Sequence, residues 1–123
     1  MLALAVSRCE TPSGQASHAL SLQLSNAGAA DGAMLLQIVG ADSSAHIDTV
    51  VAAGGSSYRV FAQRQSAVRW LVIVTGNLSN GVLVTILVPD KSLATAYTGT
   101  ILDVADASYA DLQPGSRALT ITP

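Results

Sequence analysis

The chain has 123 residues, of which 50% are hydrophobic and 11% are charged, and its net charge is −2 at pH 7. This length and this apolar share predict one folded domain over residues 1–123 and exclude a disordered chain. No basic cluster and no run of roughly 20 apolar residues occurs, so the sequence predicts no nucleic-acid partner and no membrane insertion.

Short runs of alternating apolar and polar residues, separated by turn residues, predict a chain made almost entirely of β-strands. Residues 18–25 show the clearest alternation, with three leucines on one face and polar residues on the other. The predicted strands are, in chain order, residues 2–7, 18–25, 33–39, 47–53, 58–63, 69–75, 81–88, 97–104 and 117–122. A helix of one or two turns is expected only within residues 91–96 or 105–112.

The spacing of these strands and the position of the prolines indicate the fold class. All four prolines lie at strand ends or in turns, where β-structure tolerates them. The sequence therefore predicts an all-β fold, an antiparallel sandwich of two sheets with about seven to nine strands, of the jelly-roll or immunoglobulin-like kind. The expected core is made of Leu20, Leu22, Leu24, Val60, Val68, Trp70, Val72, Val84, Ile86, Val88 and Ile101.

Several motifs follow one another in an order that is typical of a known family. They are SGQ at 13–15, LSLQLSNAG at 20–28, AMLLQI at 33–38, VRWLV at 68–72, LSNGVLVTI at 78–86, YTGTILDVADA at 97–107 and LQP at 112–114. Over residues 4–121 the chain resembles the cohesin-like domains of bacterial extracellular proteins. Between Gly40 and Ser57 it departs from that family, because residues 41–46 stand where a Tyr-Asp-Pro-type segment often occurs.

The resemblance implies a function as well as a fold. It implies a jelly-roll sandwich of the superfamily that cohesins share with carbohydrate-binding modules. It also implies a non-catalytic protein–protein interaction or assembly module, extracellular or at the cell surface, within a longer secreted protein. The implied partner is a dockerin-like module or another copy of the chain. A structural subunit that self-assembles is an alternative.

Carbohydrate binding is the other alternative within the same fold. A sugar platform needs several flat aromatic side chains exposed in a row, and only 4% of the residues are aromatic. The aromatic residues are Tyr58, Phe61, Trp70, Tyr97 and Tyr109. Because Trp70 shares its face with valines, we expect it in the core, and the remaining tyrosines make a poor platform.

Histidine, serine and cysteine residues form no catalytic or metal-binding pattern. His18 and His46 belong to no spaced ligand set, and the sequence has neither a Gly-x-Ser-x-Gly elbow nor a phosphate-binding glycine motif. Cys9 is the only cysteine, which excludes an intramolecular disulfide. The sequence therefore predicts a protein that is not an enzyme, with no catalytic residue, no cofactor and no bound metal.

Asp103, Asp106 and Asp111 form the one cluster of carboxylates. Calcium binds oxygen ligands of this type, but the spacing fits no EF-hand loop. We interpret the three residues as solvated loop acids, and calcium binding stays open as an alternative.

Two strand-like runs, residues 69–75 and 81–88, are apolar on both of their alternating faces. If the runs pair side by side with Trp70 pointing inward, their other face forms an apolar patch with polar groups at its rim. Such patches usually mark interaction sites. The predicted partner-binding residues are Arg69, Leu71, Ile73, Leu83, Thr85 and Leu87. Cover by a loop or by the N-terminal segment is the alternative.

Overall fold

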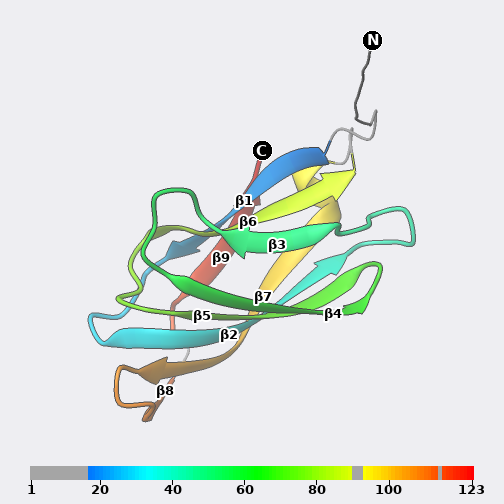
Figure 1. Cartoon of the computed structure of the whole chain (residues 1–123). Helices are drawn as coiled ribbons and strands as arrows, with labels where there is room; N and C mark the ends of the chain where they lie inside the picture. Colours follow the sequence, from blue (N-terminus) through cyan, green and yellow to red (C-terminus); the bar gives the residue numbers. More distant parts are fainter. Residues whose placement is uncertain (1–16, 90–92, 114) are drawn as a thin grey trace.

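The computed structural model describes residues 17–89, 93–113 and 115–123 and shows two antiparallel β-sheets stacked face to face (Figure 1). The strands are β1 Ser17–Ser25, β2 Asp31–Gly40, β3 Thr49–Ala52, β4 Arg59–Ser66, β5 Arg69–Thr75, β6 Gly81–Pro89, β7 Tyr97–Asp106, β8 Asp111–Leu112 and β9 Ala118–Thr122. One turn of 3-10 helix, η2 Ala94–Ala96, precedes β7. The predicted all-β sandwich is therefore confirmed, with nine strands in the described part of the chain.

The strand order is β3-β6-β1-β9 in the four-stranded sheet and β4-β5-β2-β7-β8 in the five-stranded sheet. The predicted strand over residues 2–7 lies outside the described residues, as does Cys9. The short strand β8 was not predicted, because two residues are too few to show an alternating pattern.

The core lies between the two sheets and is made of the inward-facing side chains of both. Of the predicted core residues, most are buried, Val60 and Ile101 pack against the core half-buried, and Val68 is half-buried at the end of the β4–β5 turn. The central strand β2 adds Met34, Leu36 and Ile38. Trp70 points inward as predicted and is 8% exposed, and its indole N–H has no acceptor among the described residues.

The two apolar runs form β5 and β6, and these strands lie in different sheets. The predicted side-by-side pairing of the runs is therefore wrong. The segment between them is a crossover rather than a hairpin turn: Leu78 is buried, and its N–H donates to the carbonyl oxygen of Asp31 over 3.1 Å. Since both runs have an apolar inner face, placing them on opposite sheets lets both contribute to one core, and Leu78 closes its end.

Leu83 is also on the other side of its strand from the predicted position. The pairing of β1 with β6 shifts register, so that Leu22 lies opposite Val84 while Gln23 lies opposite Val82. This β-bulge leaves Leu83 without a partner on β1 and turns it inward, where it is 0% exposed. The prediction that Leu83 faces outward is therefore wrong, and the bulge is the reason.

An ion pair joins the start of β2 to the segment before β9. The Arg117 guanidinium donates two hydrogen bonds to the Asp31 carboxylate, from Nε to Oδ2 over 2.7 Å and from Nη2 to Oδ1 over 2.6 Å. The backbone N–H of Gly28 donates a third bond to Oδ2. The hydrogen bonds from Arg117 lower the pKa of Asp31, against the opposing effect of burial, and the same contact raises the pKa of Arg117.

The loop between β2 and β3 folds over the end of the core and leaves no room for a side chain at Gly40. A Cβ at that position would clash with the carbonyl oxygen of Ala45 and lie 2.7 Å from its Cβ. Ala45 and Ile47 of this loop are buried, and the N–H of Ile47 donates to the carbonyl oxygen of Ala67. The loop is therefore held on both sides and cannot move away at low cost.

We expect Gly40→Ala to lower the free energy of unfolding by about 1–3 kcal/mol, because the added methyl group overpacks the contact with Ala45. Gly54→Ala is the matched control, since nothing lies within 4 Å of a Cβ there and its backbone is not left-handed. The control should be neutral or stabilising by about 0.4–1 kcal/mol. Urea unfolding followed by the fluorescence of Trp70 measures both. Equal stability of the two variants would contradict the tight contact.

Candidate functional site

The outer face of the five-stranded sheet carries an ordered array of side chains. The register places Phe61, Ile73, Leu35 and Asp103 in one row across β4, β5, β2 and β7. The next row toward the Trp70 end consists of Gln63, Leu71, Gln37 and Thr100, and the one beyond it of Ser66, Arg69, Val39 and Thr98. In the other direction, Arg59, Thr75, Ala33, Ala105 and Asp111 span all five strands.

The middle of this array is apolar and open to solvent. Phe61 is 61% exposed, Ile73 is 44% exposed and Leu102 is 46% exposed, while Leu35 and Leu71 are half-buried. Leu102 faces outward because it is the extra residue of a bulge between Asp103 and Ile101 on β7. We call Phe61, Ile73, Leu35, Leu71 and Leu102 the apolar patch.

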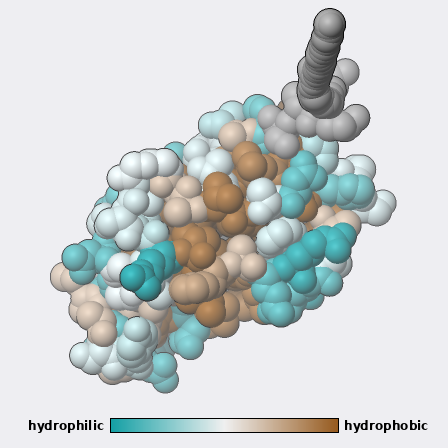
Figure 2. Space-filling view, in the orientation of Figure 1, coloured by the Kyte–Doolittle hydropathy of each residue, from teal (hydrophilic) through white to brown (hydrophobic). Residues whose placement is uncertain are grey.

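A shallow depression lies beside the patch, with a volume of about 250 Å³ and a lining that includes Leu35, Ile73 and Asp103. On the side shown in Figure 2, hydrophobic side chains form a band over the region of β3 and β4, with hydrophilic areas on either side of it. Phe61 belongs to β4, the edge strand of the five-stranded sheet.

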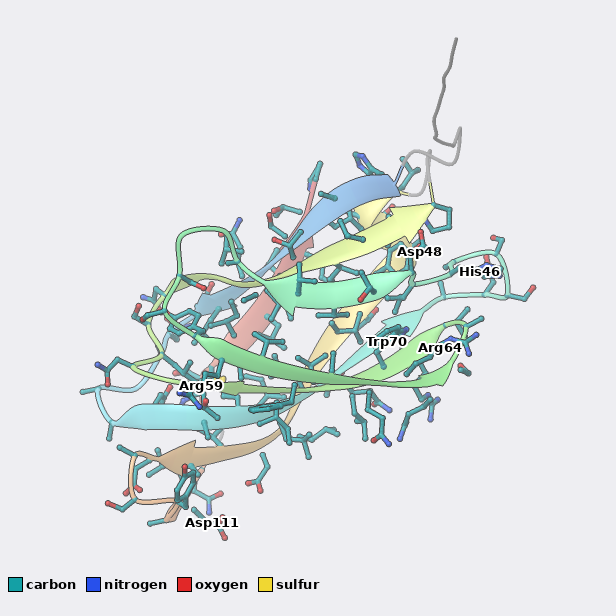
Figure 3. All side chains as sticks on the ribbon, viewed as in Figure 1. His46, Asp48, Arg59, Arg64, Trp70 and Asp111 are labelled. Atoms are coloured by element: carbon teal, nitrogen blue, oxygen red, sulfur yellow. The ribbon has the colours of Figure 1, made fainter. Side chains whose placement is uncertain are left out.

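Charges of opposite sign lie at the two edges of the same sheet. Residues 59–89 include three arginines and no acid, and two of these, Arg59 and Arg69, belong to the outer face of β4 and β5. Residues 93–116 include three aspartates and no base. Figure 3 shows Arg59 and Asp111 at the same end of the sheet, on its opposite edges. The patch is thus bordered by a basic edge and an acidic edge.

The six predicted binding residues do not form one surface. Arg69, Leu71 and Ile73 share the outer face of the five-stranded sheet, and the structure brings them together as predicted. Thr85 and Leu87 belong to the outer face of the four-stranded sheet, on the opposite side of the sandwich. That second face is rich in small polar side chains, and Gln23 Nε2 donates to Thr122 Oγ1 across it over 3.1 Å.

Phe61, Leu35 and Leu102 were not among the predicted binding residues. The alternation of residues 58–63 places Phe61 with Arg59 and Gln63, opposite the half-buried Val60, so the signal for Phe61 was present. Leu35 and Leu102 follow only from the pairing partners of β2 and β7, which the sequence does not specify. No sequence signal marked the bulge that exposes Leu102.

The three aspartates near β8 have separate surroundings. Asp106 accepts hydrogen bonds from the backbone N–H groups of Ser108 and Ala110, which closes the β7–β8 turn. Asp103 accepts one from the N–H of Val104, and Asp111 is exposed at the sheet edge. Within residues 17–89, 93–113 and 115–123, no group of three or more His, Cys, Asp or Glu is placed to hold a metal ion.

The face offers flat apolar contact, amide and hydroxyl groups beside it, and charges at its border. No family model, no curated protein and no solved structure matches the chain. Among the described residues, no helix is long and apolar enough to cross a bilayer.

Proposed function

We propose that the chain is a non-catalytic protein–protein interaction module that docks a partner through the apolar patch. In keeping with the resemblance of its motifs to cohesin-like domains, we propose that it works as part of a bacterial extracellular or cell-surface protein. The observation that carries the proposal is the exposure of Phe61 and Ile73 in the middle of an ordered sheet face.

The energetics favour contact over solvent exposure for this face. Burying a large apolar side chain fully is worth about 1.5–3 kcal/mol, so two such anchors supply a useful part of a binding free energy. Gln37, Gln63 and Thr100 lie beside the anchors in the next row. Polar groups at the border of an apolar contact fix its register, as in ordinary protein interfaces.

The aromatic side chains favour a protein partner over a sugar. Trp70 and Tyr97 are buried, and Tyr97 donates its hydroxyl hydrogen to the carbonyl oxygen of His46 over 2.6 Å. The exposed aromatic residues of the described part are Phe61 on β4 and Tyr109 in the β7–β8 turn, at opposite edges of the sheet. They form no row on which a sugar chain would stack.

We expect Ile73→Lys to weaken partner binding about tenfold or more without unfolding the domain, because a charge replaces a central apolar contact. Val51→Lys is the matched control: Val51 is also β-branched and is 43% exposed, against 44% for Ile73, but lies on β3 of the other sheet. Immobilised wild-type domain would retain proteins from the secreted and surface fraction of the source bacterium. Each retained protein is then purified and titrated separately against wild type, Ile73→Lys and Val51→Lys, which gives the three dissociation constants.

The outcome separates this function from its rivals. Loss of binding in Ile73→Lys alone supports docking through the patch. Equal binding by wild type, Ile73→Lys and Val51→Lys would overturn the proposal.

A further inference from the structure

The outermost row of the five-stranded sheet has one charge at each end. Arg59 on the edge strand β4 and Asp111 on the edge strand β8 are joined through Thr75, Ala33 and Ala105, each directly opposite the next. Four inter-strand spacings separate the ends, which amounts to about 19 Å. Arg59 and Asp111 cannot pair with each other inside one chain at that separation, and both side chains are exposed to solvent.

The direction of this charge separation limits how two such faces can meet. In a face-to-face stack with a two-fold axis parallel to the strands, the β4 edge of each copy lies over the β8 edge of the other. Arg59 of one copy then lies opposite Asp111 of the second, and the reverse pair forms at the other edge. With the axis perpendicular to the strands, β4 lies over β4 and β8 over β8, so the basic edge faces the basic edge and Arg59 has no Asp111 opposite it. The charges therefore select the first arrangement.

We propose that the partner of the apolar patch is a second copy of the chain, stacked face to face about a two-fold axis parallel to the strands, with Arg59 of each copy opposite Asp111 of the other. The inference rests on the proposed function, because both use the same face. A two-fold interface of this kind is self-complementary, as most homodimer interfaces are.

The apolar residues fit the same arrangement. Because β2 is the middle strand, the axis passes over it, and Leu35 meets Leu35 of the second copy. Ile73 on β5 comes to lie over β7 of the second copy, where Asp103 occupies the same row and the exposed Leu102 lies next to it. Two twisted sheets pack at about 30° to each other, so the contacts are closest near the axis. Apolar contact is then concentrated at the axis, with Arg59 and Asp111 at the border and Asp103 beside Ile73.

The size of the face predicts a weak dimer. The four rows run about 20 Å along the strands and at most about 19 Å across them, so the flat area is no more than roughly 400 Å² on each copy. A standard stable interface buries about 800 Å² on each partner, so we expect association in the micromolar to millimolar range. Exposed ion pairs are screened by salt, and the dimer should therefore weaken as the salt concentration rises.

Charge reversal tests the pairing directly. Arg59→Asp alone, or Asp111→Arg alone, puts like charges opposite each other at both edges and should raise the dimer dissociation constant about tenfold or more. An equimolar mixture of the two variants restores both attractive pairs, because each variant supplies the sign that the other lacks. We expect the mixture to form a heterodimer at close to the wild-type dissociation constant. Sedimentation equilibrium, with one variant labelled, measures all three.

Arg64→Asp is the matched control. Arg64 is an exposed arginine of the same strand, but it lies opposite Trp70 and belongs to the inner side of β4. Its reversal changes the net charge by the same amount as Arg59→Asp and should leave the dimer at its wild-type strength. Circular dichroism of each variant confirms that the fold is retained.

Each outcome bears on the two proposals separately. Recovery of association on mixing supports the dimer, since only complementary contact between two copies explains it. A wild-type chain that stays monomeric at millimolar concentration, or variants that do not recover on mixing, would overturn the dimer. If the dimer is overturned but Ile73→Lys no longer binds a different protein that wild type binds, the docking function stands without the dimer. If Ile73→Lys changes neither association, both proposals fall.

Discussion

Arg117→Met is expected to lower the free energy of unfolding by about 3–5 kcal/mol at neutral pH, the cost of leaving one member of a buried ion pair without its partner. The Asp31 side chain is 0% exposed and the Arg117 side chain is 12% exposed. Methionine keeps much of the apolar stem of arginine, so the loss reports the guanidinium contacts, with Asp31 and with the carbonyl oxygen of Gln113, rather than a cavity. Urea unfolding, followed by the fluorescence of the single tryptophan Trp70, gives the difference.

The pH dependence gives this prediction a distinct signature. In the wild type, the hydrogen bonds from Arg117 lower the pKa of Asp31 below its unfolded value of about 3.9, so the pair stabilises the fold above that pH and loses its effect as the pH falls through the folded pKa. Without Arg117, burial is the largest remaining influence and raises the pKa of Asp31, against the hydrogen bond from the N–H of Gly28, so we expect folding to take up a proton. The wild type therefore loses stability in acid while the variant gains it, and their difference shrinks.

Other groups do not disturb this comparison. Asp42 also has a lowered pKa, through hydrogen bonds from Ser44, but it is present in both proteins and cancels in the difference. The double variant Asp31→Asn/Arg117→Met removes the buried charge and should recover part of the lost stability. A difference between wild type and Arg117→Met below about 1 kcal/mol, or one that stays constant from neutral to acid pH, would contradict the role of the pair.

The strands were predictable because alternation is a local property. Residues 18–25 and 69–75 match β1 and β5 within one residue at each end. Their grouping into sheets was not predictable in the same way, since pairing joins residues far apart in the chain. The segment 76–80 contains turn residues around one leucine, and Leu78 is buried. An apolar residue in the middle of an apparent turn is a signal that favours a crossover over a hairpin, and the prediction of side-by-side pairing did not use it.

The candidate surface was predictable only in part. The inward position of Trp70 determined which side of β5 faces outward, so Leu71 and Ile73 were placed correctly on the outer face. The residues assigned from 81–88 depended on a pairing that does not occur. The Asp31–Arg117 pair was not predictable from the sequence, because its members are 86 residues apart and neither belongs to a motif.

Leu83→Ala is expected to lower the free energy of unfolding by about 2–5 kcal/mol, because Leu83 is fully buried and its truncation leaves a cavity between the sheets. Leu87→Ala, four residues further along β6, should cost about 1 kcal/mol or less, since Leu87 is half-buried on the outer face. The two leucines have the same parity along the strand, so simple alternation places both outside and predicts similar, small losses. The bulge opposite Leu22 and Gln23 breaks that parity. Urea unfolding measures the loss of stability in each variant. Similar small losses would contradict the inward position of Leu83 at the bulge, whereas a large loss for Leu83→Ala alone would support it.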